Sequence, residues 1–284
     1  CADGIKESLA EAAIKEDFRA YRFLPLEVQE RRPDLARLAL ENKSQWGRVE
    51  LPPALLQNTE FMRQVLDKQP SLLAEVGEEL RGDAELVRQL VAVDGQALRY
   101  ASDSLRNDPA FVASLLDGQP SAFCHAGESV VSNLELARKA FTVDPQVYVG
   151  LPQAQRCDLR IAKLALEYDA LLFGRLPHEM QTAEYAIYGL EHGKTRADVI
   201  YEYALGDRLK ADPLVIQANL VRNPQDFDKF IGRHRNDKAF IAQIAKRNPA
   251  LVDYLPARMK SRVLQDREVK SAHRQLQHTM KQLD

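Results

Sequence analysis

Two stretches of the sequence decide the fold: Leu90–Asp108, LVAVDGQALRYASDSLRND, and Leu115–Asn133, LLDGQPSAFCHAGESVVSN. The second begins 25 residues after the first and repeats its order of apolar, turn-forming and polar positions. Self-similarity at a fixed interval is typical of repeat proteins, in which one copy cannot bury its own apolar face and neighbours must stack. The sequence therefore predicts an array of short repeats.

One position of the 25-residue interval holds small side chains that accept hydrogen bonds. Its members are Asn58, Asp83, Asp108, Asn133 and Asp158, and the same spacing returns at Asp212 and Asp237. Asp and Asn are favoured just before a helix, because the side-chain oxygen accepts a hydrogen bond from an otherwise unpaired backbone N–H. Apolar residues follow three, four, seven and eight places later, as on one face of an amphipathic helix. Each interval is therefore expected to begin with a helix of about three turns.

A second recurring position lies twelve residues after each of these side chains and holds Pro or Gly: Pro70, Gly95, Pro120, Pro145, Pro224 and Pro249. Proline fits the first turn of a helix, where its missing N–H costs no hydrogen bond. A shorter helix is expected to begin there, so that each interval forms a helical hairpin. The predicted fold is all-α: a right-handed α-solenoid of about nine hairpins of about 25 residues, with a capping helix at each end.

The sequence predicts three regions. Residues 1–32 form an N-terminal capping helix region, residues 33–256 the repeat array, and residues 257–284 a charged C-terminal helix. The array has an irregular copy near residues 182–211, because four extra residues appear before Asp212. The C-terminal helix is equally suited to capping the array and to binding a partner.

The pattern from Asp83 to Ala101, D-x-x-L-V-x-x-L-V-x-x-D-G-x-A-L-x-x-A, returns with similar residues in the neighbouring intervals. It resembles the repeat of the family called domain of unknown function 4116, and the resemblance is strongest over residues 58–157. The resemblance implies short helical repeats in tandem, of the kind found in bacterial secreted effector-like proteins and in protist and giant-virus proteins. It implies no catalytic residue, because the family has no assigned catalytic motif.

Composition indicates a folded chain with a charge asymmetry. Hydrophobic residues make up 45% of the chain and charged residues 28%, which suits a buried core rather than overall disorder. The net charge is −2, yet residues 1–206 carry 23 basic and 32 acidic side chains, and residues 207–284 carry 16 and 9. Such asymmetry is typical both of a partner contact at one end and of an ordinary solvated surface.

The hydropathy of the chain, its first residue and its cysteines indicate where in or outside the cell the protein is expected. No apolar run approaches the roughly 20 residues that span a bilayer, so no transmembrane segment is expected. Cys124 and Cys157 are expected to be free thiols. Such thiols suit a reducing compartment, which favours a cytoplasmic protein or one secreted into a host cell. Cys1 is expected to mark a fragment boundary. The alternative is the lipid-anchored first residue of a mature bacterial lipoprotein.

Three local motifs resemble known catalytic or metal-binding motifs, but each lacks a feature that the chemistry requires. Tyr188–Thr195, YGLEHGKT, ends like a phosphate-binding loop, but the first glycine of G-x-x-x-x-G-K-T is replaced by Tyr188. HEMQT at His178 lacks the second histidine of a zinc-protease helix. Cys124 and His125 are adjacent, so on a helix their side chains diverge by about 100°. We expect no catalytic residue, metal or cofactor.

The basic C-terminal third supplies the candidate site. Around one turn between repeats and at a related position of the array lie Arg222, Lys229, Arg233, His234, Arg235 and Lys238. A basic patch of this kind suits an acidic protein or an anionic lipid such as a phosphoinositide. Nucleic acid is a weaker fit, because exposed aromatics for base stacking are not interleaved.

These observations favour a non-catalytic scaffold for protein–protein interaction. It would hold a protein or peptide along the concave face of the array and form part of a larger bacterial effector-like protein. The first alternative is an anionic-ligand module that uses the basic patch. The second is an enzyme whose site lies in a groove between repeats.

Overall fold

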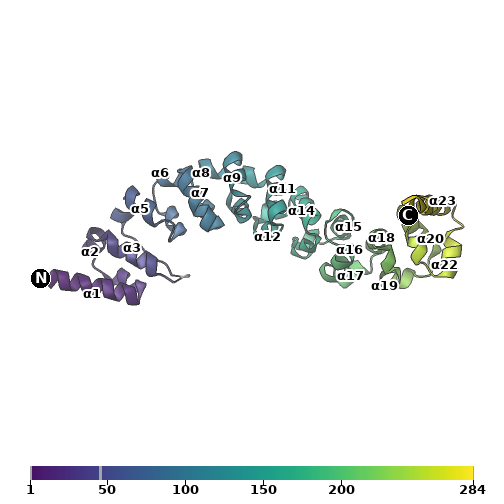
Figure 1. Ribbon diagram of the computed structural model, residues 1–284, viewed down its shortest axis with the longest axis horizontal. Coiled ribbons are helices and arrows are strands. Elements are labelled where there is room, and N and C mark those ends of the chain that lie inside the picture. The colour runs from purple at the N-terminus through teal and green to yellow at the C-terminus, as the bar shows by residue number, and fades with distance from the viewer. Residues whose placement is uncertain (1, 45–46, 284) are drawn as a thin grey trace. The chain divides into compact units, whose positions relative to one another are not determined.

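The computed structural model describes residues 2–44 and 47–283, and the side chains of residues 9–44 and 47–282. Every regular segment in these residues is helical (Figure 1), which confirms the predicted all-α class. The chain divides into two compact units, Cys1–Leu151 and Pro152–Asp284. The alternatives for Cys1 concern a residue outside the described part of the chain. The predicted region boundaries at residues 32 and 256 stay predictions.

The first unit contains α-helices and short 3-10 helices, the latter labelled η. In chain order they are α1 (Ala2–Glu16), η1 (Phe18–Phe23), α2 (Leu26–Arg31), α3 (Pro33–Asn42), α4 (Pro53–Leu56), α5 (Thr59–Val65), η2 (Pro70–Ala74), α6 (Glu78–Arg81), α7 (Ala84–Val93), η3 (Gly95–Tyr100), α8 (Asp103–Arg106), α9 (Pro109–Leu115), η4 (Pro120–His125), α10 (Glu128–Val131), α11 (Leu134–Val143) and α12 (Val147–Gly150). Residues 47–52, between α3 and α4, are not helical.

The predicted helix caps are in place. Asp83 Oδ1 accepts hydrogen bonds of 3.1 Å from the backbone N–H groups of Glu85 and Leu86, at the start of α7. The side chains of Asn58, Asp108 and Asn133 cap α5, α9 and α11 in the same way. These bonds satisfy amides that the first turn of a helix leaves unpaired. The acceptor side chains therefore fix where each long helix begins.

Each interval has three helical pieces where the sequence predicted two. The second piece is a 3-10 helix (η2, η3, η4), and a third piece of one α-helical turn follows it. The third pieces α4, α6, α8 and α10 begin 25 residues apart, at residues 53, 78, 103 and 128. Four residues are too few to show a helical period, which is why the sequence pattern did not reveal them.

The first unit packs interval against interval. Helix α7 packs on α9 and α9 on α11, while η2 packs on η3 and η3 on η4. Backbone bonds join the intervals as well: Ser102 N–H donates to Arg81 O over 2.8 Å, and Gly127 N–H donates to Arg106 O over 2.7 Å. The apolar faces of the long helices are buried, with Val87, Val112 and Ala137 fully enclosed. Each interval thus covers apolar side chains of its neighbour.

The second unit repeats these pieces less regularly. Its elements are α13 (Gln153–Arg156), α14 (Leu159–Tyr168), η5 (Ala170–Arg175), η6 (His178–Met180), α15 (Ala183–His192), α16 (Ala197–Val199), the π-helix η7 (Ile200–Ala204), α17 (Asp207–Lys210), α18 (Pro213–Arg222), η8 (Pro224–Asp226), α19 (Phe227–Phe230), η9 (Gly232–His234), α20 (Lys238–Arg247), α21 (Leu251–Tyr254), α22 (Ala257–Val263) and α23 (Arg267–Leu283). The π-helix lies within the irregular copy expected near residues 182–211.

The C-terminal region forms two helices where one was expected. Helix α22 ends at Val263 and α23 begins at Arg267. Asp266 accepts hydrogen bonds from the backbone N–H groups of Glu268 (2.9 Å) and Val269 (3.3 Å), so it caps α23 as the other acidic residues cap their helices. Both helices pack on α20. Within residues 2–44 and 47–283, no helix combines the length and apolar character that crossing a membrane requires.

Candidate functional site

The six residues of the predicted basic patch all lie in the second unit, but one of them serves the fold. Arg222 ends α18, and its guanidinium donates to the carbonyl oxygens of Leu190 (2.9 Å) and Gly193 (2.8 Å). These carbonyls belong to the C-terminal end of α15, where helical C=O groups lack partners within the helix. Arg222 therefore ties α18 to the end of α15, while the residue stays exposed to solvent.

Two further residues of the patch are paired with acidic side chains. Lys229 Nζ lies 2.7 Å from Glu202 Oε2, and its ammonium group is 4.8 Å from the centre of the Phe230 ring. Arg235 is paired with Asp228. All four charged side chains are substantially exposed, so these pairs contribute little to stability. They do reduce the net positive charge of the patch.

The remaining three residues lie on η9 and at the start of α20. Arg233 Nε is 3.3 Å from His234 Nε2, and the His234 ring lies 4.4 Å from the Phe240 ring. Lys238 Nζ donates to Gln265 Oε1 over 3.1 Å. The structure thus brings Arg233, His234 and Arg235 together at one turn, while Arg222 and Lys238 contact other elements.

The motif that resembles a phosphate-binding loop comprises the last five residues of α15, Tyr188–His192, and the start of the turn between α15 and α16. Lys194 N–H donates to Glu167 O over 2.9 Å, and Lys194 Nζ lies 3.8 Å from the centre of the Tyr168 ring. Thr195 Oγ1 accepts from Ala170 N–H over 3.2 Å. These contacts hold the turn against α14 and η5. Among the side chains that the structure describes, no group of three or more His, Cys, Asp or Glu could hold a metal ion.

A hollow of about 500 Å³ opens in the first unit, over the turns where the 3-10 helices begin. We call it the turn hollow; its walls are Val93, Asp94, Gly95, Gln96, Gln119, Ser121, Cys124, His125 and Gly150. Three pairs among these residues are 25 apart in sequence: Asp94 and Gln119, Gln96 and Ser121, His125 and Gly150. The turn hollow is therefore built from equivalent positions of successive intervals.

The two chemically reactive groups of the turn hollow are not poised for nucleophilic attack. Burial raises the pKa of the Cys124 thiol to about 11, and its Sγ–H donates to Val147 O over 3.3 Å. Burial and the nearby Arg99 guanidinium lower the pKa of His125. The thiolate is the nucleophilic form of cysteine, so a thiol that stays protonated at neutral pH is a poor nucleophile.

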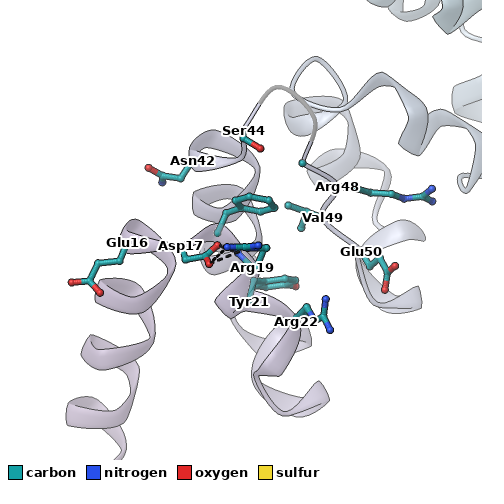
Figure 2. Close-up of a pocket in the computed structure, with 12 residues that line it drawn as sticks. Glu16, Asp17, Arg19, Tyr21, Arg22, Asn42, Ser44, Arg48, Val49 and Glu50 are labelled. Atoms are coloured by element: carbon teal, nitrogen blue, oxygen red, sulfur yellow. Dashed lines mark hydrogen bonds and ion pairs between the residues drawn. The ribbon is translucent and has the colours of Figure 1, made fainter.

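A larger pocket, about 1010 Å³, lies between η1 and residues 42–44 and 47–50 (Figure 2). Three arginines and three acidic residues line it: Arg19, Arg22, Arg48, Glu16, Asp17 and Glu50. Asp17 and Arg19 pair with each other at 2.8 Å, as the dashed lines in Figure 2 show. Arg48 reaches Glu75 over 2.7 Å, and Arg22 lies over the Phe23 ring. The three basic side chains are matched by three acidic ones, and Arg19 and Arg48 already pair with carboxylates. The pocket therefore does not favour an anionic ligand.

Tyr21 forms part of the floor of this pocket. Its side chain is only 1% exposed, and its hydroxyl has no hydrogen-bond partner among the described residues. Burial raises the pKa of Tyr21. A buried hydroxyl without a partner is costly. The pocket is bordered by Ser44 and Gly47, which flank the two residues that the structure does not describe.

The comparisons with known proteins give one match. Residues 58–106 match the family model named Domain of unknown function (DUF4116). The match begins at the cap Asn58 and ends one residue short of two 25-residue intervals. It confirms over these residues the resemblance seen in the sequence. No curated protein and no solved structure matches the chain.

The sequence did not point to either the turn hollow or the N-terminal pocket. The one available signal was the recurrence of Gln-Pro-Ser at residues 69–71 and 119–121, which marks equivalent turns. Nothing in the residues themselves shows whether such a turn is covered or open. That depends on what packs against it.

Proposed function

We propose that the chain is a non-catalytic scaffold that binds a protein through an extended segment of that protein. In this proposal the recurring helical pieces form a right-handed α-solenoid of about nine copies, within a larger bacterial effector-like protein. The support comes from packing within the first unit, where each long helix and each 3-10 helix lies against its counterpart.

The observation that carries the proposal is the composition of the turn hollow. Its walls come from three successive intervals: Val93–Gln96 in the first, Gln119 and three residues of η4 in the second, and Gly150 at the end of α12 in the third. Side chains that recur at a fixed interval can contact successive residues of a bound peptide, which is how extended repeat surfaces achieve recognition. The state of Cys124 and His125 favours binding over catalysis at this place.

The experiment is affinity capture with variants that separate the two candidate surfaces. Gln96→Arg fills the turn hollow, because Gln96 is exposed on its wall. Gln89→Arg is the matched control, since Gln89 is exposed on α7 outside the hollow. Arg233→Glu with Arg235→Glu reverses the charge at η9. A photo-cross-linking amino acid at Ser121 identifies any partner that reaches the hollow.

We expect one partner to be cross-linked from Ser121, to be lost at least tenfold with Gln96→Arg, and to be retained with both other variants. Loss confined to the charge-reversal variant would instead establish the basic residues as the binding site for an acidic ligand. Retention by all variants would exclude both surfaces and leave a substrate screen as the next step.

A further inference from the structure

We propose that Gln119 is a binding residue that clamps the main chain of an extended peptide in the turn hollow. This inference rests on the proposed function and names the ligand class and one residue that recognises it. The observation behind it is that a second glutamine of this chain, in the same structural position, already binds the main chain of a non-helical residue of its own protein.

Gln69 and Gln119 occupy equivalent positions. Both belong to the pattern D-x-Q-P-S, at residues 67–71 and 117–121, and each directly precedes a 3-10 helix that begins with proline, η2 or η4. The backbone angles agree closely: φ −147° and ψ 83° at Gln69, and φ −144° and ψ 75° at Gln119. The two side chains therefore leave the backbone from the same local geometry.

Gln69 shows what this position can bind. Its Oε1 accepts from Val49 N–H over 2.9 Å, and its Nε2 donates to Val49 O over 3.2 Å. Val49 lies in the non-helical residues 47–52, so its main-chain groups are not used by a helix. The carboxamide of Gln69 thus forms hydrogen bonds with both the backbone N–H and the backbone C=O of Val49. It recognises the main chain of this residue and not its side chain. Gln69 is only 4% exposed in this arrangement.

Gln119 faces a different neighbour. The preceding interval supplies the 3-10 helix η3, whose backbone groups form hydrogen bonds with one another. Ala97 N–H donates to Asp94 O (2.9 Å) and Ala101 N–H to Leu98 O (3.1 Å). Gln119 Oε1 accepts only the Ser121 hydroxyl, at 3.1 Å, and its Nε2 has no hydrogen-bond partner among the residues that the structure describes. A carbonyl oxygen accepts two hydrogen bonds, so both ends of the amide can take a ligand.

A glycine keeps the Gln119 side chain in place. A Cβ atom added to Gly95 would lie 2.3 Å from Ser121 Oγ and 3.0 Å from Gln119 Cγ. Gly95 therefore lets the Gln119 stem and Ser121 approach the backbone of the preceding turn. On the same wall Val93 is 64% exposed, which offers an apolar contact to a neighbouring aliphatic residue of the peptide. The ligand is an extended peptide with a free main-chain N–H and C=O on one residue beside an aliphatic side chain.

The test begins with twelve-residue peptides selected from a random library against the full chain. Affinities for the selected peptides are measured with the native chain, with Gln119→Ala, Gln119→Glu and Gln96→Arg, and with Gln89→Ala as the matched control. Each peptide is also made with single N-methylated residues, which removes one main-chain N–H at a time.

We expect Gln119→Ala to weaken binding about tenfold, as the loss of two hydrogen bonds implies. Gln119→Glu should weaken it less, because it keeps an acceptor.

N-methylation shows whether the contact is with the main chain. At one peptide residue it should weaken binding to the native chain and have no further effect on Gln119→Ala, which is the result of a double-mutant cycle for interacting groups. If Gln96→Arg abolishes binding while Gln119→Ala leaves it unchanged, the clamp is wrong and the turn hollow remains a binding site. If neither variant weakens binding, or no peptide is selected, both the clamp and the proposed function are overturned.

Discussion

At the scale of single residues, the acidic caps do most to fix the structure. Asp83 is the best example, because its carboxylate caps α7 and lies 2.5 Å from Arg63 Nη1 of the preceding long helix. The backbone hydrogen bond from Leu86 and the bond from Arg63 hold the pKa of Asp83 below its ordinary value. A carboxyl group with a lowered pKa stabilises the folded state above its unfolded pKa and loses this effect as the pH falls.

Replacing this cap should lower stability in a way that depends on pH. Asp83→Ala is expected to lower the free energy of unfolding by about 1 kcal/mol at pH 7, because two amides of α7 lose their partner. Asp83→Asn keeps the cap and should lose less. The difference between the native chain and Asp83→Ala should shrink below a pH of about 3.8. Urea unfolding followed by circular dichroism measures all three, and equal stabilities at pH 7 would contradict the prediction.

The two described cysteines should react at different rates. Burial raises the pKa of Cys124 to about 11, and the thiol is held by Val147 O. Cys157 is more accessible, although slight burial and Glu179 raise its pKa too. Because alkylation needs both the thiolate and access, we expect iodoacetamide at pH 8 to label Cys157 first. Peptide mass spectrometry over time follows both sites; faster labelling of Cys124 would show that the hollow is more open than described.

At the scale of elements, the distances between neighbouring helices are set by small residues. Gly193 follows α15, and a Cβ atom there would lie 2.5 Å from Gly189 O, 2.9 Å from Ala170 Cβ and 3.0 Å from Leu166 O. Two of these three atoms belong to the backbone, which cannot turn aside. The backbone of Gly193 is ordinary, with φ −63°, so glycine is needed for space and not for conformation.

A Gly193→Ala substitution should therefore be costly. We expect a loss of about 1–3 kcal/mol in the free energy of unfolding, as for other overpacked sites. Gly174→Ala is the matched control in the same unit, because a Cβ atom there meets nothing within 4 Å. Thermal and urea unfolding of both variants measure the difference. Equal stabilities would mean that the end of α15 shifts at little cost.

At the scale of the whole molecule, the chain consists of two compact units that meet in sequence at Leu151 and Pro152. The predicted basic residues lie in the second unit, and the turn hollow lies wholly in the first. Residues 1–206 carry a net negative charge and residues 207–284 a net positive charge, and the positive segment lies wholly within the second unit. Binding through the turn hollow would then depend on the first unit alone.

A fragment of residues 1–151 tests this division. Since its helices make their packing contacts within the unit, we expect a helical circular dichroism spectrum and cooperative unfolding. The fragment should bind the selected peptides with the affinity of the full chain. An unfolded fragment, or a folded one that does not bind, would show that the second unit is needed.

The sequence by itself determined the helical class, the 25-residue interval and the start of the long helices that an Asp or Asn of this interval caps. These features depend on local chemistry: an Asp or Asn accepts the unpaired amides next to it, and apolar residues three and four apart share one face. It could not distinguish 3-10 from α-helix at η2 to η4, nor show the one-turn helices that follow them.

Only the tertiary structure decided which turns are covered and which side chains remain free to bind. Gln69 and Gln119 share the pattern D-x-Q-P-S and have nearly the same backbone angles, yet Gln69 is buried against Val49 while Gln119 lines an open hollow. Arg222, predicted to belong to a basic patch, also holds the end of α15 through two hydrogen bonds that the sequence did not indicate. In each case the outcome depends on a segment 20 to 32 residues away, and the local sequence does not show what will pack against it.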